Sequence, residues 1–245
     1  MLEVRGLSKS FGALRACDGI DLDVREGETH AVIGPNGAGK TTFISQLAGN
    51  LRPDAGTVRF AGADITTLPA PRRARLGLAR SFQITSVYPE FSALDNVALA
   101  VQAHSGHSFR FWRTARGDPA LVQPARKVLD EVGLGERSQV LAANLAHGEQ
   151  RQLEVAMALA TGPRLLLLDE PMAGMGTEES QRMIELLARL KQTKTLILVE
   201  HDMDAVFRLA DRISVLVYGR VIATDVPDRI KMNEEVRKAY LGEDL

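Results

Sequence analysis

The chain has 245 residues, the size of one large domain or of two small lobes that share a core. Its 30 basic side chains against 31 acidic ones leave a net charge of −1, without the basic excess typical of a domain that binds nucleic acid. One cysteine cannot form an internal disulfide, and no apolar run is long enough to cross a membrane, so we expect a cytoplasmic protein that meets any membrane through a partner.

Short strands dominate residues 1–60. The segments LEVRGL, IDLDV and TVRF alternate apolar and polar residues, which predicts an antiparallel sheet with one exposed face. Between the second and third of them, Thr29–Ile33 is an apolar strand that runs into a glycine cluster. A helix is expected over residues 41–50, followed by a turn at residues 52–56.

Helical spacing replaces this pattern over residues 95–160, which are rich in alanine and leucine, apart from an irregular stretch at 105–119. Apolar strands and helices then alternate: LLLLDE, a helix at 177–192, TLILVE, a helix at Met203–Leu209, and ISVLVYGR. Strands separated by helices are typical of a mostly parallel sheet. We therefore predict an α/β fold that carries a helical insertion.

The glycine cluster has the sequence GPNGAGKT, which matches the phosphate-loop pattern G-x-x-x-x-G-K-[ST] between a strand and a helix. Glycines let backbone N–H groups converge on phosphates at the positive end of a helix dipole. The lysine adds charge for the β- and γ-phosphates, and the threonine hydroxyl can bind Mg²⁺. The alternative is a glycine-rich turn that binds nothing. The predicted nucleotide-binding residues are Gly34, Pro35, Asn36, Gly37, Ala38, Gly39, Lys40, Thr41 and Thr42.

Two adjacent carboxylates follow the apolar segment LLLL, as phosphoryl transfer to water requires. We predict that Asp169 binds the metal, through a bound water, and that Glu170 polarises the attacking water. Taken alone, the pair is also compatible with a solvated strand end or a helix cap. The phosphate loop in the same chain favours the catalytic interpretation.

Between these motifs lies the segment LAHGEQ, and here the chain resembles the ATP-binding cassette (ABC) ATPases, whose signature has the form L-S-G-G-Q. The resemblance implies a P-loop NTPase (RecA-like) core with an antiparallel β subdomain and an inserted helical subdomain. It divides the chain into a core at 1–83 and 161–225, a helical subdomain at 84–160 and a helical tail at 226–245. It also implies that Ala146, His147, Gly148 and Glu149 contact the ATP held by an opposite subunit.

Three more residues match the family one at a time. Phe11 matches the aromatic residue that stacks on adenine, although a phenylalanine after a strand is also ordinary core. Gln83 matches the glutamine that senses Mg²⁺ and the γ-phosphate. The alternative is that Gln83 is simply an exposed polar residue. His201 matches the switch histidine that contacts the γ-phosphate and orients the water with Glu170, although a lone histidine is more often structural.

The chain departs from the family at two places. Ala146 and His147 stand where the signature has serine and glycine, so one hydroxyl bond to the opposite γ-phosphate is missing. The segment AGMG ends in Gly176, without the aspartate of the family's dimer loop. Both departures put the coupling between two sites in doubt.

The segments LAHGEQRQLEVAMAL, AGMG, VEHDM and AYLGE resemble ATPase subunits of branched-chain amino acid importers, and the stretch at 105–119 resembles the longer of the two such subunits. The implied partners are membrane permeases, a second ABC ATPase subunit in a homo- or heterodimer and, indirectly, a periplasmic or extracellular solute-binding protein, but no nucleic acid. The chain would then lie on the inner face of the cell membrane. The alternatives are another transporter type or a soluble ABC ATPase acting on nucleic acid or ribosomes. We expect no metal site at His104 and His107, and a buried Cys17.

Overall fold

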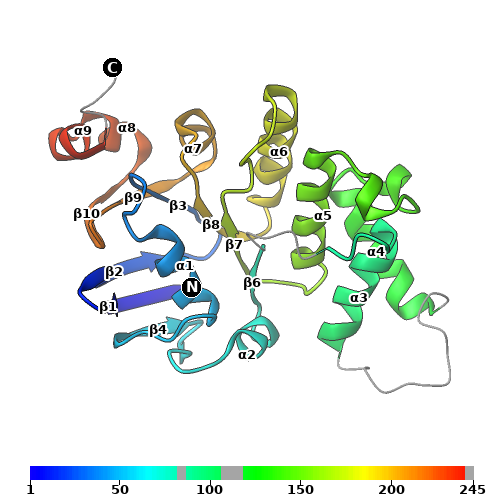
Figure 1. The fold of residues 1–245 in the computed structure, drawn as a ribbon, viewed down its shortest axis with the longest axis horizontal. Helices are drawn as coiled ribbons and strands as arrows, with labels where there is room; N and C mark the ends of the chain where they lie inside the picture. Colours follow the sequence, from blue (N-terminus) through cyan, green and yellow to red (C-terminus); the bar gives the residue numbers. More distant parts are fainter. Residues whose placement is uncertain (82–86, 106–117, 241–245) are drawn as a thin grey trace.

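The polypeptide folds into two sheets at one side of the molecule and a group of helices at the other (Figure 1). This arrangement comes from a computed structural model, which describes residues 1–81, 87–105 and 118–240. None of the helices in these ranges is long and apolar enough to cross a membrane.

The smaller sheet is antiparallel, as its alternating sequence predicts. It contains β1 (Leu2–Phe11), β2 (Leu14–Val24), β4 (Ala55–Phe60) and β5 (Ala63–Asp64), in the order β2-β1-β4-β5. Leu2 of β1 lies opposite Val24 on one side and Phe60 on the other, and all three side chains are buried. The apolar face of this sheet therefore packs into the molecule while its polar face meets the solvent.

The larger sheet has the order β10-β9-β3-β8-β7-β6, and its only antiparallel pair in the described residues is β9 with β10. Its strands are β3 (Thr29–Ile33), β6 (Leu78–Arg80), β7 (Leu165–Asp169), β8 (Thr195–Val199), β9 (Arg212–Val217) and β10 (Arg220–Asp225). Every residue of β3, β7 and β8 is buried, as in parallel strands covered on both faces. The predicted mostly parallel sheet is therefore confirmed.

Helices cover this sheet and form the lobe beside it. Those next to the sheet are α1 (Lys40–Ala48), α2 (Ala70–Arg75), α6 (Thr177–Leu190) and α7 (Met203–Leu209). The lobe contains α3 (Ala93–Ser105), α4 (Pro119–Glu131), α5 (His147–Leu159) and two short 3₁₀ turns, Gly135–Arg137 and Ala142–Asn144. The chain continues through α8 (Pro227–Met232) and α9 (Glu234–Tyr240). The observed α1 and α6 start within one residue of the predicted helices and end two residues earlier.

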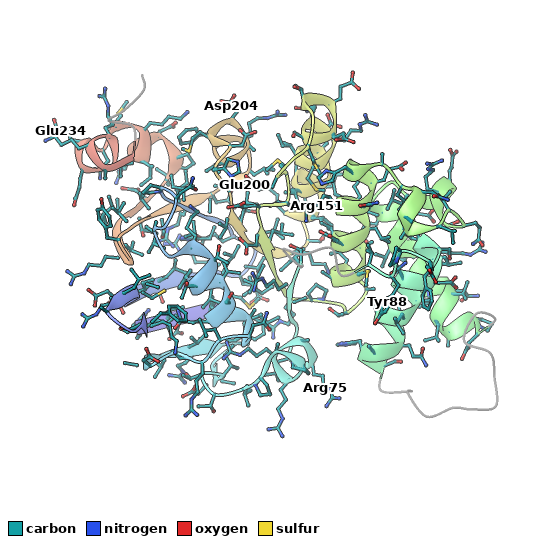
Figure 2. All side chains as sticks on the ribbon, viewed as in Figure 1. Arg75, Tyr88, Arg151, Glu200, Asp204 and Glu234 are labelled. Carbon is teal, nitrogen blue, oxygen red and sulfur yellow. The ribbon has the colours of Figure 1, made fainter. Side chains whose placement is uncertain are left out.

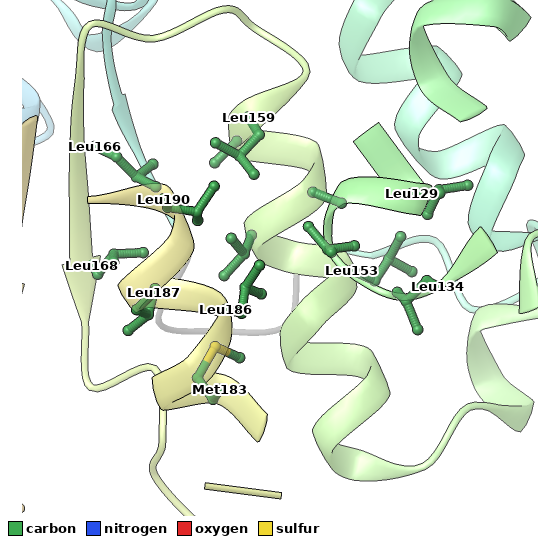
Figure 3. Packing of buried hydrophobic residues seen from close by; sticks show 14 of the residues in the cluster. Leu129, Leu134, Leu153, Leu159, Leu166, Leu168, Met183, Leu186, Leu187 and Leu190 are labelled. Carbon is green, nitrogen blue, oxygen red and sulfur yellow. The ribbon is translucent and has the colours of Figure 1, made fainter. Parts of the chain in front are cut away.

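The helical lobe shares its hydrophobic core with the larger sheet, because α6 packs between β7 and α5 (Figure 3). Leu186 and Leu187 of α6 are almost fully buried, with Leu166 of β7 on one side and Leu153 of α5 on the other. Burying a leucine side chain contributes about 1.5–3 kcal/mol, so this continuous core holds α5 firmly against the sheet through α6. The division of the chain into subdomains at 84 and 160 stays a prediction.

Candidate functional site

The residues predicted to carry the chemistry follow neighbouring parallel strands at one edge of the larger sheet. The phosphate loop follows β3, His201 follows β8, and Asp169 ends β7 with Glu170 directly after it, in the spatial order β3-β8-β7. In open α/β sheets, ligands bind outside the carboxyl ends of the strands. The topology therefore brings these three segments to the edge where a ligand is expected.

Two glycines of the phosphate loop are required by close packing against neighbouring strands. A Cβ at Gly34 would lie 2.0 Å from the carbonyl oxygen of Leu216, and one at Gly39 would lie 2.1 Å from that of Ala16. Gly39 also has a φ of 102° and directly precedes α1. No side chain caps the N-terminus of α1, and no acidic residue lies in its first turn. The loop thus leads into a helix end that favours an anion.

Lys40 is buried beneath this loop. Its Nζ donates hydrogen bonds to the carbonyl oxygens of Gly34 at 2.6 Å and Pro35 at 3.1 Å. Burial lowers the pKa of Lys40, and the negative charges of Glu170 and Asp169 oppose this change. The structure therefore brings a cation and two carboxylates together across α1 and β7, as the motifs predict.

Asp169 is fully buried at the end of β7 and is paired with an arginine that the sequence analysis missed. Its Oδ2 accepts a hydrogen bond from Arg80 at the end of β6, at 2.7 Å, while its Oδ1 is buried without a partner. Burial raises the pKa of Asp169, and the Arg80 guanidinium opposes this change. The buried, unpartnered carboxylate oxygen of Asp169 is the kind of oxygen donor that Mg²⁺ prefers.

Glu170, the next residue, has a backbone conformation that is uncommon for a non-glycine residue. Its φ is 50°, the residue is half-buried, and its backbone N–H donates a hydrogen bond to the carbonyl oxygen of Val199. Such conformations persist where the surrounding structure enforces them, often at functional sites. The bond to β8 holds Glu170 at the ligand edge of the sheet.

His201 lies at this edge with 60% of its side chain exposed. Its Nδ1 is 3.9 Å from the Oε2 of Glu200, a buried carboxylate that the sequence analysis did not single out. Glu200 accepts hydrogen bonds from the amides of Met172 and His201, and burial raises its pKa. Figure 2 shows Glu200 near the middle of the molecule. Glu200 thereby ties the segment after β7 to the one after β8.

The predicted in-trans residues form the N-terminus of α5, which stands apart from α1 on the far side of α6 (Figure 1). Here the chain supplies its own carboxylates. The amide of Ala146 donates to Glu149, and the amide of Gly148 donates to Oε1 of Glu179 on α6 at 3.2 Å. A hollow of about 130 Å³ opens at this end, lined by Ala146, Gly148, Glu149, Gln152, Glu179 and Arg182. Glu179 carries no motif and was missed.

The two departures from the family pattern lie against each other. A Cβ at Gly174, in the segment AGMG, would be 3.2 Å from Cε1 of His147. Gly176 precedes α6, and its amide donates to Oε2 of Glu179 at 3.3 Å. One carboxylate, that of Glu179, therefore contacts the first turns of both α5 and α6.

Phe11 ends β1 with 51% of its surface exposed, so it is not a core residue. The Nζ of Lys9 lies 5.8 Å from the centroid of its ring. Cys17 is buried, as expected: Gln46 donates to its Sγ, and burial raises the pKa of its thiol to about 11. Gln83, His107 and most of the stretch at 105–119 lie outside the described residues.

Two family models match the chain. The family model for the ABC transporter matches residues 17–173, and the model for the branched-chain amino acid ATP-binding cassette transporter matches residues 220–245. A high-affinity branched-chain amino acid transport ATP-binding protein, BraF of Pseudomonas aeruginosa, is 39% identical over 99% of this chain and 98% of its own. LivG of Escherichia coli, with the same description, is 36% identical over the same shares.

Solved structures show the same fold over the whole chain. A nucleotide-free ATP-binding cassette from an ABC transporter has a TM-score of 0.87 and 27% identity, covering 99% of both chains. The ADP conformation of an ATP-binding cassette has the same TM-score, identity and coverage. The fold class expected from the resemblance, a P-loop NTPase core with an antiparallel sheet and added helices, is thus confirmed.

Proposed function

Because the chain belongs to the ABC transporter family and is an ATPase of that family, we propose that it couples ATP hydrolysis to the import of branched-chain amino acids. The substrate rests on the names of relatives that match the whole chain and on the C-terminal family model. The observation that carries the ATPase chemistry is the juxtaposition of buried Lys40 with Asp169 and Glu170 at the end of the phosphate loop.

We propose the following roles for the residues of the site. The amides of residues 34–42 and the Lys40 ammonium hold the phosphates, and Phe11 stacks on the adenine from its exposed position. Asp169, Thr41 and Gln83 would hold Mg²⁺, and the bound ion would supply positive charge against the transferring phosphate. Glu170 accepts the proton of the attacking water, and His201 orients that water and the γ-phosphate.

We further propose that two ABC ATPase subunits complete each other's sites. The N-terminus of α5 lies apart from α1 in the same chain, so it serves the nucleotide of an opposite subunit. Separate membrane permeases convert the closure of this dimer into transport and hold the chain at the inner face of the membrane. A solute-binding protein delivers the amino acid to them.

The test is Glu170→Gln, compared with wild type and with Glu131→Gln on the exposed end of α4. General-base assistance is typically worth 10²–10⁴-fold, so phosphate release should fall by at least about a hundredfold while Mg²⁺ and ATP still bind. Asp169→Asn should instead impair Mg²⁺ binding. Near-normal phosphate release by Glu170→Gln would reject Glu170 as the base.

The transported solute is tested in cells that lack this gene but keep the permeases. Uptake of labelled leucine should return with the wild-type gene and with Glu131→Gln, and should stay absent with Glu170→Gln. If neither the wild-type gene nor Glu131→Gln restored leucine uptake, the chain would serve another solute or another system.

A further inference from the structure

The short edge strand β6 ends in an arginine that points into the molecule. Arg80 pairs with Leu167 of β7 in the ladder, and only 12% of its side chain is exposed. Burying a guanidinium is costly unless it is paired and hydrogen-bonded. A buried ion pair adds little stability compared with a hydrophobic pair of similar size, so packing alone does not account for an arginine here.

Arg80 joins two elements that carry predicted metal-binding residues. One terminal nitrogen donates to Oδ2 of Asp169 on β7 at 2.7 Å, and the other donates to the hydroxyl of Ser45 on α1 at 3.2 Å. The guanidinium is a rigid, planar fork, so two contacts from its two arms fix the direction from which Asp169 is held. Ser45 lies one helical turn beyond Thr41 on α1.

The contact with Asp169 uses one carboxylate oxygen and leaves the other unpaired. Oδ1 is buried and has no hydrogen-bond partner among the described residues. Lys40, the other cation whose charge acts on Asp169, is held by the carbonyl oxygens of Gly34 and Pro35. Arg80 is thus the cation that sets the orientation of this carboxylate, and Oδ1 is the oxygen left for a further ligand.

We propose that Arg80 is a positioning residue for the metal site: by holding Oδ2 of Asp169 and the hydroxyl of Ser45, it presents Oδ1 of Asp169 to Mg²⁺. This inference rests on the proposed nucleotide site. Partners that hold a metal-binding side chain typically contribute 10–100-fold to metal affinity, although they do not touch the metal. Arg80 is such a partner of Asp169: it holds the carboxylate and does not touch the metal.

The experiment measures equilibrium binding of a fluorescent ATP analogue by the full chain, titrated with MgCl₂ and repeated in EDTA. For Arg80→Met, the Mg²⁺ concentration at half-saturation should rise about 10–100-fold, while binding in EDTA stays that of wild type. Arg80→Lys keeps the charge but not the fork, and Ser45→Ala removes one anchor, so both should give smaller increases. Arg75→Met, an exposed arginine on α2, should behave as wild type.

An unchanged Mg²⁺ requirement in a folded Arg80→Met would overturn the proposal. So would an equal loss of binding in MgCl₂ and in EDTA, because a collapsed site indicates a purely structural role. If Arg80→Met does not fold, an unchanged requirement in both Arg80→Lys and Ser45→Ala has the same meaning. Failure of the wild type to bind the analogue in any condition would instead reject the nucleotide site itself.

Discussion

The N-termini of α1 and α5 are both expected to meet phosphate, yet the chain builds them in opposite ways. At α1 the first turn has no acidic residue and no side-chain cap, and a buried lysine lies beneath it. At α5 the first turn contains Glu149, and Glu179 reaches across from α6 to the amide of Gly148. A helix N-terminus carries a partial positive charge, which α1 leaves open and α5 satisfies with carboxylates of the same chain.

The N-terminus of α1 is open to a phosphate in a single chain. At the N-terminus of α5, a phosphate has to take the place of a carboxylate of the same chain. A phosphate that binds at α1 meets the partial positive charge of the helix N-terminus, which no carboxylate of the described residues satisfies. A phosphate approaching α5 in the proposed dimer meets Glu179, and two anions repel each other at short range. Closing the dimer therefore has to move or neutralise Glu179, whereas loading α1 requires no such step.

The largest effect on ATP binding should come from removing the Lys40 charge beneath the N-terminus of α1, the open end. We expect Lys40→Ala to weaken ATP binding by about 2–5 kcal/mol, the range for truncating one partner of a buried charge pair. A fluorescent ATP analogue at equilibrium measures this, and Lys127→Ala on the exposed face of α4 is the control. Unchanged affinity would show that the amides at α1 suffice without the lysine.

A second variant asks whether the open end belongs to a site for a whole nucleotide. Phe11→Ala should weaken ATP by about 1–3 kcal/mol, the range for losing one stacked base. GTP should lose as much, because stacking does not read the base edge. Phe91→Ala, another partly exposed phenylalanine, is the control. Equal affinity for wild type and Phe11→Ala would assign the base to another residue.

The N-terminus of α5, the filled end, is tested by Glu179→Gln, which keeps an acceptor oxygen but loses the charge. Without nucleotide, the free energy of unfolding should fall by about 0.5–2 kcal/mol, measured in urea, because two helix ends lose an anion. In a Glu170→Gln background with Mg-ATP, the same change should increase the dimer fraction in size-exclusion chromatography.

Glu178→Gln is the matched control for Glu179, because its side chain is one residue earlier on α6 and 91% exposed. Because Glu178 also lies in the first turn of α6, Glu178→Gln should lower the unfolding energy by less than Glu179→Gln does, and it should leave the dimer fraction unchanged. Less dimer with Glu179→Gln than with this control would reverse our view of the α5 terminus.

The smallest effect concerns the chain's cysteine, below the open end. Because burial raises the pKa of Cys17 to about 11, its thiol stays protonated at pH 8 and should react slowly with iodoacetamide. Mg-ATP should slow the reaction further, since Cys17 donates to the carbonyl of Gly39 in the phosphate loop. Labelling as fast as that of the urea-unfolded chain would contradict the burial of Cys17.

The sequence predicts the open end well and the filled end poorly, for a physical reason. The phosphate loop, its lysine and the flanking strand and helix are neighbours in the chain, so local pattern and turn chemistry specify them. Glu179 contacts Gly148 across 31 residues, and Arg80 contacts Asp169 across 89. Neither residue has a motif of its own. Only the packing of α6 between β7 and α5, and of β6 beside β7, brings these partners together.

The positive φ of Glu170 has an evolutionary consequence. A non-glycine residue held at such an angle costs about 1–3 kcal/mol of stability. Drift to glycine or asparagine at this position would relieve that cost, and would at the same time remove the carboxylate that we propose activates water. Selection for a more heat-resistant chain and selection for turnover therefore pull position 170 in opposite directions, and a glutamate here is maintained only while hydrolysis is required.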